Sequence, residues 1–119
     1  MKLIAAETES LALSRWLSGA RPVGSSLLLT EVPRAVARRA DATALAAATA
    51  TALASVQTVS VGARLLRVAA ALGPPALRSL DALHLATALA VGPLAAFVCY
   101  DARLADAARE QGLPVVAPA

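Results

Sequence analysis

Three of the eight acidic residues occupy positions where a carboxylate could do chemistry. Glu31 lies in LLLTEV, Asp81 lies in SLDALHLA, and Asp101 directly follows the apolar run LAAFVCY. Each is expected near a helix N-terminus, and Asp101 at the carboxyl end of a buried strand, which is the edge where open parallel sheets bind ligands. Carboxylates that converge there repel one another by about 4 kcal/mol per pair, at ~4 Å and an effective dielectric near 20. A divalent cation such as Mg²⁺, which prefers oxygen ligands, would remove that repulsion.

A cation held in this way could act on a phosphodiester. Water bound to a metal ion loses a proton more readily, and the ion also offsets the negative charge of the transition state. The spacing alone leaves a second interpretation open, namely three unrelated helix caps. Carboxylates near helix N-termini satisfy unpaired N–H groups and complement the helix dipole without any ligand.

Basic residues stand beside these acids. Arg78 lies three positions before Asp81, and Arg34 lies three positions after Glu31. A guanidinium next to an acidic site can hold a phosphate through two hydrogen bonds, although both could equally be surface arginines near helix starts. His84 lies one helical turn after Asp81, and we expect it to pack within the helix layer rather than act as a general base.

The length and composition indicate one compact domain over residues 1–119. Apolar residues make up 58% of the chain and aromatic residues 3%, so alanine, leucine and valine must supply the core. The net charge of +3 comes from arginines and the single Lys2, which favours weakly a nucleic-acid or acidic partner. Cys99 is the only cysteine, which excludes a disulfide framework within the chain. We find no secretory signal or membrane-spanning run, and therefore expect a cytoplasmic protein with no membrane partner.

Helical and apolar patterns alternate along the chain. Short, almost wholly apolar strands separated by helices indicate an α/β architecture, a parallel sheet flanked by helices. We expect the second helix to become regular near Thr30, with Pro33 in its first turn. We also expect Asp41 and Asp101 to cap the helices that follow them, and Asp81 to open its own helix. The predicted helices cover 5–18, 27–40, 42–54, 63–72, 81–91 and 102–111, and the predicted strands cover 22–24, 56–61, 94–100 and 113–116.

Three segments carry a family resemblance: LRSLDALHLATAL (77–89), AFVCYDARLADAAREQGLPVVAP (96–118) and, less specifically, SSLLLTEVPRAVARR (25–39). The chain resembles the PIN-domain ribonucleases, specifically the VapC-type toxins of type II toxin–antitoxin pairs. The resemblance implies a three-layer PIN-like fold and an endoribonuclease that uses Mg²⁺, with Mn²⁺ as a substitute. Glu31, Asp81 and Asp101 match the second, third and fourth acids of that family and would be its catalytic metal ligands. It also implies an RNA substrate, a small antitoxin as partner, and a homodimer.

The chain departs from this pattern at two places. Members usually open with a hydrophobic strand that ends in the family's first acid and forms the centre of the sheet, whereas this chain begins at Met1-Lys2-Leu3. We therefore expect the natural protein to start upstream, and the 119-residue form to cleave RNA weakly. The alternative is an inactive PIN-like module that binds RNA or an antitoxin. Cys99 stands where the family usually has Thr or Ser, and we interpret it as a small buried residue at a strand end.

Overall fold

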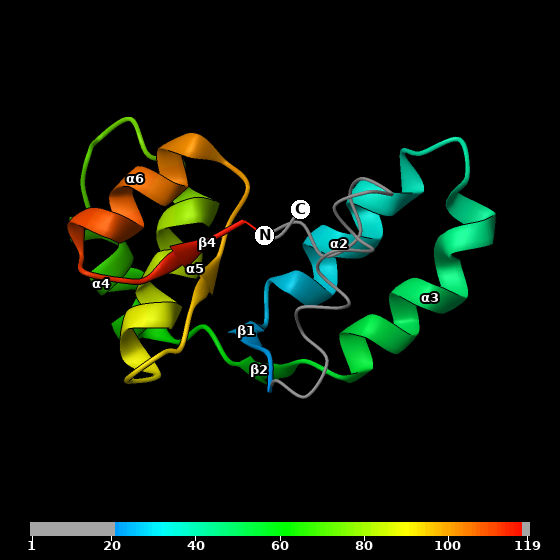
Figure 1. The fold of residues 1–119 in the computed structure, drawn as a ribbon, viewed down its shortest axis with the longest axis horizontal. Coiled ribbons are helices and arrows are strands. Elements are labelled where there is room, and N and C mark those ends of the chain that lie inside the picture. The colour runs from blue at the N-terminus through cyan, green and yellow to red at the C-terminus, as the bar shows by residue number, and fades with distance from the viewer. Residues whose placement is uncertain (1–20, 118–119) are drawn as a thin grey trace. The chain divides into compact units, whose positions relative to one another are not determined.

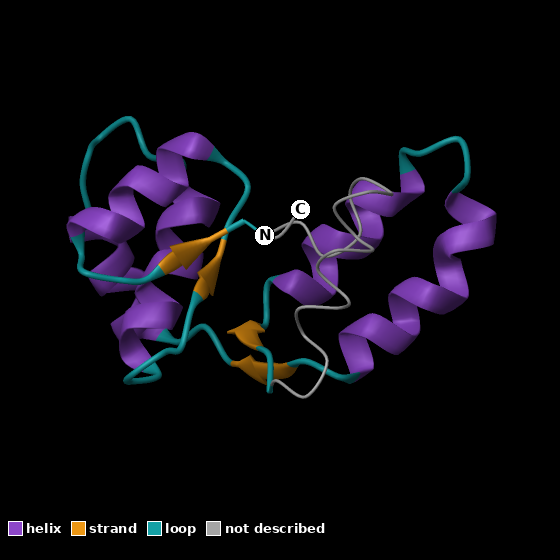
Figure 2. Cartoon of the chain, viewed as in Figure 1, coloured by secondary structure: helices purple, strands orange, loops and turns teal. Residues whose placement is uncertain are grey.

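The structure is a computed structural model that describes residues 21–117 (Figures 1 and 2). The helices and strands follow one another in the order that the sequence predicts, which confirms the α/β class. The predicted helix 5–18 lies outside the described residues. The elements are β1 (Val23–Ser25), α2 (Leu28–Ala37), α3 (Ala42–Ala54), β2 (Gln57–Val59), α4 (Ala63–Ala71), α5 (Ser79–Ala90), β3 (Phe97–Val98), α6 (Ala102–Glu110) and β4 (Val115–Val116). They divide into two compact units between Thr58 and Val59, here called the N-terminal and C-terminal units.

The N-terminal unit consists of a short two-stranded sheet and a pair of helices. β1 pairs with β2, and the N–H of Gln57 donates to the carbonyl of Pro22 at 2.9 Å. α2 packs against α3. Leu28, Val32 and Val36 recur every four residues along α2 and are all buried, because residues at this spacing share one helix face.

The predicted start of α2 near Thr30 is wrong. The helix begins at Leu28, so Pro33 lies in its interior rather than in its first turn. Proline there removes one intrahelical hydrogen bond, the one to the carbonyl four residues earlier. Pro33 and Leu29 are both exposed, so water can reach this side of the helix and limit the cost.

Two aspartates precede helices in the structure, but only one caps its helix. The backbone of Asp41 has φ −99° and ψ 21°, outside the extended region from which a side chain can cap. Its carboxylate instead accepts from Arg39 Nε at 2.9 Å and from Nη2 at 3.2 Å, and hydrogen bonding to Arg39 lowers the pKa of Asp41. The prediction that Asp41 caps α3 is therefore wrong: the residue stands at the helix start, but its side chain makes no capping hydrogen bond.

The C-terminal unit packs α5 against both α4 and α6. Its main core combines Leu85 of α5, Phe97 and Cys99 of the β3 segment, and Leu104 and several alanines of α6. α5 buries residues on several of its sides, which explains why its sequence is apolar nearly all round. Small alanines at these contacts let the helix backbones approach closely.

The strands of this unit are shorter than predicted. β3 and β4 pair in parallel, with Phe97 opposite Val115 and Val98 opposite Val116. Pro114 accepts a hydrogen bond from the N–H of Phe97 at 2.7 Å but has no N–H to donate, which limits the ladder on that side. Because no described strand joins them, β1–β2 and β3–β4 stay separate two-stranded sheets.

A glycine stands two residues beyond the end of both α5 and α6. Gly92 follows α5 with φ +90°, and Gly112 follows α6 with φ +84°. After α6, the N–H of Gly112 donates to the carbonyl of Arg109 at 2.9 Å, and the N–H of Leu113 donates to that of Ala108 at 3.0 Å. This pair of bonds is the Schellman arrangement, in which the left-handed residue is most often glycine. Gly92 and Gly112 therefore occupy the left-handed position just beyond α5 and α6.

Candidate functional site

Asp81 lies in the first turn of α5. The helix begins at Ser79, with Arg78 in the N-cap position in an extended conformation, so the prediction that the helix opens at Asp81 places its start two residues too late. The side chain of Asp81 is only 16% exposed. At the third helical position a carboxylate complements the positive end of the helix dipole.

Asp101 connects the end of the β3 segment to α6 and caps that helix. Its Oδ1 accepts from the N–H of Leu104 at 2.9 Å, which confirms the predicted cap. This hydrogen bond, followed by the positive charge of Arg78, lowers the pKa of the Asp101 carboxyl. The cap occupies Oδ1, and the other oxygen, Oδ2, is the one that faces Arg78.

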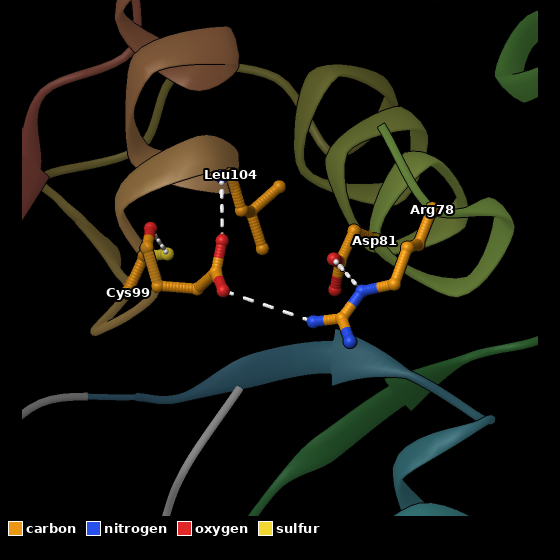
Figure 3. A network of polar contacts seen from close by, with 5 residues as sticks. Arg78, Asp81, Cys99 and Leu104 are labelled. Carbon is orange, nitrogen blue, oxygen red and sulfur yellow. Dashed lines mark hydrogen bonds and ion pairs between the residues drawn. The ribbon is translucent and has the colours of Figure 1, made fainter. Parts of the chain in front are cut away.

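Arg78 brings the two aspartates together. Its Nε donates to Asp81 Oδ2 at 3.3 Å, and its Nη2 lies 3.7 Å from Asp101 Oδ2 (Figure 3). One guanidinium therefore lies between carboxylates from the N-terminal ends of α5 and α6. The first contact has the i,i+3 spacing of a helical ion pair, but no local pattern in the sequence indicates the second.

Cys99 is buried, as the sequence predicts, with 3% of its surface exposed. Its Sγ donates to the backbone carbonyl of Asp101 at 3.2 Å, and burial raises the pKa of the thiol. The thiol thus supports the backbone at Asp101 rather than the carboxylate itself. His84 is also buried within the helix layer, 4% exposed, as expected for a packing residue.

The remaining predicted site residues lie in the N-terminal unit. Glu31 is in the first turn of α2 with a partly buried side chain, and Arg34 follows on the same helix and is exposed. Within the C-terminal unit the structure brings together Asp81, Asp101 and Arg78. The assignment of Glu31 and Arg34 to the same site stays a prediction.

The two aspartates of the C-terminal unit fit part of a divalent-cation site. Each presents one carboxylate oxygen to a shared positive charge, and such hard oxygen donors are what Mg²⁺ prefers. Within residues 59–117, no group of three His, Cys, Asp or Glu side chains is placed to hold a metal ion. Two carboxylates suffice for a Mg²⁺ site that keeps several waters and is completed by substrate phosphate.

Comparison with known proteins identifies the family. The model of the PIN domain matches residues 1–115. The chain belongs to the PIN-domain family. Among curated relatives, it is 44% identical to Ribonuclease VapC35 of Mycobacterium tuberculosis (strain ATCC 25618 / H37Rv), over 99% of this chain and 90% of the relative. Ribonuclease VapC46 of the same strain is 41% identical over 99% of this chain and 91% of the relative, and Ribonuclease VapC47 (strain CDC 1551 / Oshkosh) is 34% identical over 98% and 90%.

These matches confirm the resemblance of this PIN-domain chain to VapC-type ribonucleases. No solved structure matches it. Across residues 21–117, none of the helices combines the length and hydrophobicity needed to cross a membrane.

Proposed function

We propose that this PIN-domain protein is a metal-dependent endoribonuclease, the toxin of a type II toxin–antitoxin pair. The observation that carries the proposal is that Asp81 and Asp101, at the N-terminal ends of α5 and α6, both face the guanidinium of Arg78. The alignment with named ribonucleases over 99% of the chain supports the choice of RNA as substrate.

In the proposed site, Glu31, Asp81 and Asp101 hold Mg²⁺, or Mn²⁺ in its place. The bound ion would offset negative charge on the phosphodiester and make a water easier to deprotonate. The protein supplies the positioning: the N–H of Leu104 fixes Asp101 at 2.9 Å, and the first turn of α5 fixes Asp81. Arg78 and Arg34 are the proposed phosphate-binding residues, because a guanidinium binds phosphate through paired hydrogen bonds.

The relatives' names and the family resemblance also suggest partners. We propose an antitoxin of the VapB type as inhibitor, a homodimer as the assembly, and the cytoplasm as the location. That residues 1–119 form a single PIN-like domain also stays a prediction.

The decisive experiment is RNA cleavage with Mg²⁺ or Mn²⁺ and with EDTA, using the parent chain and Asp81→Asn. Asp106→Asn is the matched control, because Asp106 is also an aspartate in a helical i,i+3 pair with arginine but has a side chain that is 76% exposed. We expect cleavage to require the divalent ion, to be lost in Asp81→Asn and to persist in Asp106→Asn. Cleavage in EDTA, or full activity of Asp81→Asn, would refute the proposal.

The same comparison should include a chain extended at its N-terminus by a hydrophobic strand that ends in aspartate. The family resemblance predicts weak cleavage without that acid, so the extended chain should cleave faster than the parent chain. If both forms bind RNA and neither cleaves it, the protein is the inactive binding module instead.

A further inference from the structure

The contacts of Arg78 occupy one carboxylate oxygen of each of two proposed metal ligands, Asp81 and Asp101. Asp101 commits Oδ1 to the N–H of Leu104, and its Oδ2 faces Arg78 Nη2. The Oδ2 of Asp81 accepts from Arg78 Nε. A single guanidinium therefore lies against one oxygen of each carboxylate (Figure 3).

A divalent ion and this guanidinium cannot both contact the same two carboxylate oxygens. Mg²⁺ or Mn²⁺ binds carboxylate oxygens at roughly 2.0–2.2 Å, whereas the guanidinium nitrogens lie 3.3 Å and 3.7 Å from those oxygens. An ion bound to both oxygens would place two further positive charges beside Arg78, and at such distances like charges repel strongly.

Arg78 is also able to leave. Its side chain is 74% exposed, and it projects from the residue before α5 rather than from within the helix. Exposed ion pairs at these separations are individually weak. The same chain position can therefore hold the guanidinium against the carboxylates or release it to solvent.

We propose that Arg78 is a positioning residue that competes with the divalent ion for Asp81 and Asp101, and that it is displaced when the ion binds. This inference rests on the proposed metal site. It adds a consequence that phosphate binding alone does not have, because Arg78 tunes the affinity for the ion and becomes available to substrate phosphate only after the ion has arrived.

The test is Mn²⁺ binding in the absence of RNA, measured by the electron paramagnetic resonance signal of free Mn²⁺. Removing the competitor in Arg78→Met should lower the dissociation constant about threefold to tenfold, the range expected when weak exposed ion pairs are lost. The Mn²⁺ dissociation constant of Arg78→Lys should lie between those of the parent and Arg78→Met. An ammonium keeps the positive charge but cannot span two acceptors as the planar guanidinium does.

Two control variants separate competition from general charge effects. Arg109 forms a comparable i,i+3 pair with Asp106 on α6, and Arg109→Met should leave Mn²⁺ binding unchanged. Arg103 also acts on Asp101, through its charge and a backbone hydrogen bond, whereas Arg78 faces the carboxylates of both aspartates, so Arg103→Met should have a smaller effect than Arg78→Met. An equal effect of Arg103→Met would show that the electric field is responsible and would overturn the proposal.

A second readout follows Arg78 directly. In ¹⁵N spectra of the arginine Nε–H groups, titration with diamagnetic Mg²⁺ should shift the Arg78 signal and leave the Arg109 signal in place. An unmoved Arg78 signal at saturation would contradict displacement.

The outcomes also distinguish this inference from the proposed function. Equal or weaker Mn²⁺ binding by Arg78→Met, with RNA cleavage by the parent intact, overturns the competition alone. If Arg78→Met binds Mn²⁺ more tightly than the parent chain and the parent chain cleaves no RNA, the competition is supported and the nuclease function is refuted. If no variant binds Mn²⁺, both proposals fail.

Discussion

Asp101 has two roles that substitution can separate. Its Oδ1 caps α6 through the N–H of Leu104, and its Oδ2 faces Arg78 in the proposed metal site. Asp101→Asn keeps an oxygen that can accept from Leu104, whereas Asp101→Ala removes it. The cap should therefore survive the first substitution only, while the carboxylate is lost in both.

The two contacts set the expected changes in the free energy of unfolding. Replacing an N-cap acceptor by alanine costs about 1 kcal/mol, within a range of roughly 0.5–2. The contact with Arg78 spans 3.7 Å between side chains that are 74% and 39% exposed, so its loss costs about 0–1 kcal/mol. We expect Asp101→Ala to lose about 1–2 kcal/mol, and Asp101→Asn to lose about half as much or less.

Urea denaturation followed by circular dichroism measures the stabilities, and RNA cleavage with Mn²⁺ measures the function. Both variants should lose cleavage, while only Asp101→Ala should show the full loss of stability. Equal destabilisation by the two substitutions would refute the capping argument. Cleavage by Asp101→Asn at the parent rate would remove Asp101 from the catalytic assignment.

Further predictions concern the core, a helix end and the acid dependence of stability. Leu85→Ala should destabilise the protein by about 2–5 kcal/mol, because Leu85 is fully buried, whereas Leu80→Ala, at a side chain 46% exposed, should change thermal stability far less. Gly112→Ala should cost about 1 kcal/mol in denaturant titrations, since Gly112 has φ +84°; an unchanged midpoint would contradict the Schellman interpretation. The lowered pKa of Asp101 stabilises the fold above the ordinary aspartate value near 3.9. That stabilisation is lost as the pH falls through the native pKa, so Asp101→Asn should show a shallower fall in unfolding free energy below about pH 4, and a slope equal to that of the parent would argue against the shift.

The local sequence determined most of the helices and their ends. The four-residue repeat of Leu28, Val32 and Val36 predicts the buried face of α2, and Gly112 predicts the end of α6. The position of Asp101 between an apolar run and a helical pattern predicts a cap, and the structure has that cap. These features are predictable because a helix depends on contacts among residues three or four apart. The same local motifs, around Asp81 and Asp101, were sufficient to indicate the PIN-domain family.

The tertiary structure decided what depends on segments far apart in the chain. The lengths of β3 and β4 follow from which of their backbone groups find partners. Above all, the packing of α5 against α6 places Asp101 beside Arg78. No spacing rule indicates that contact, since a side-chain pair between two helices is set by how the helices pack and not by separation along the sequence.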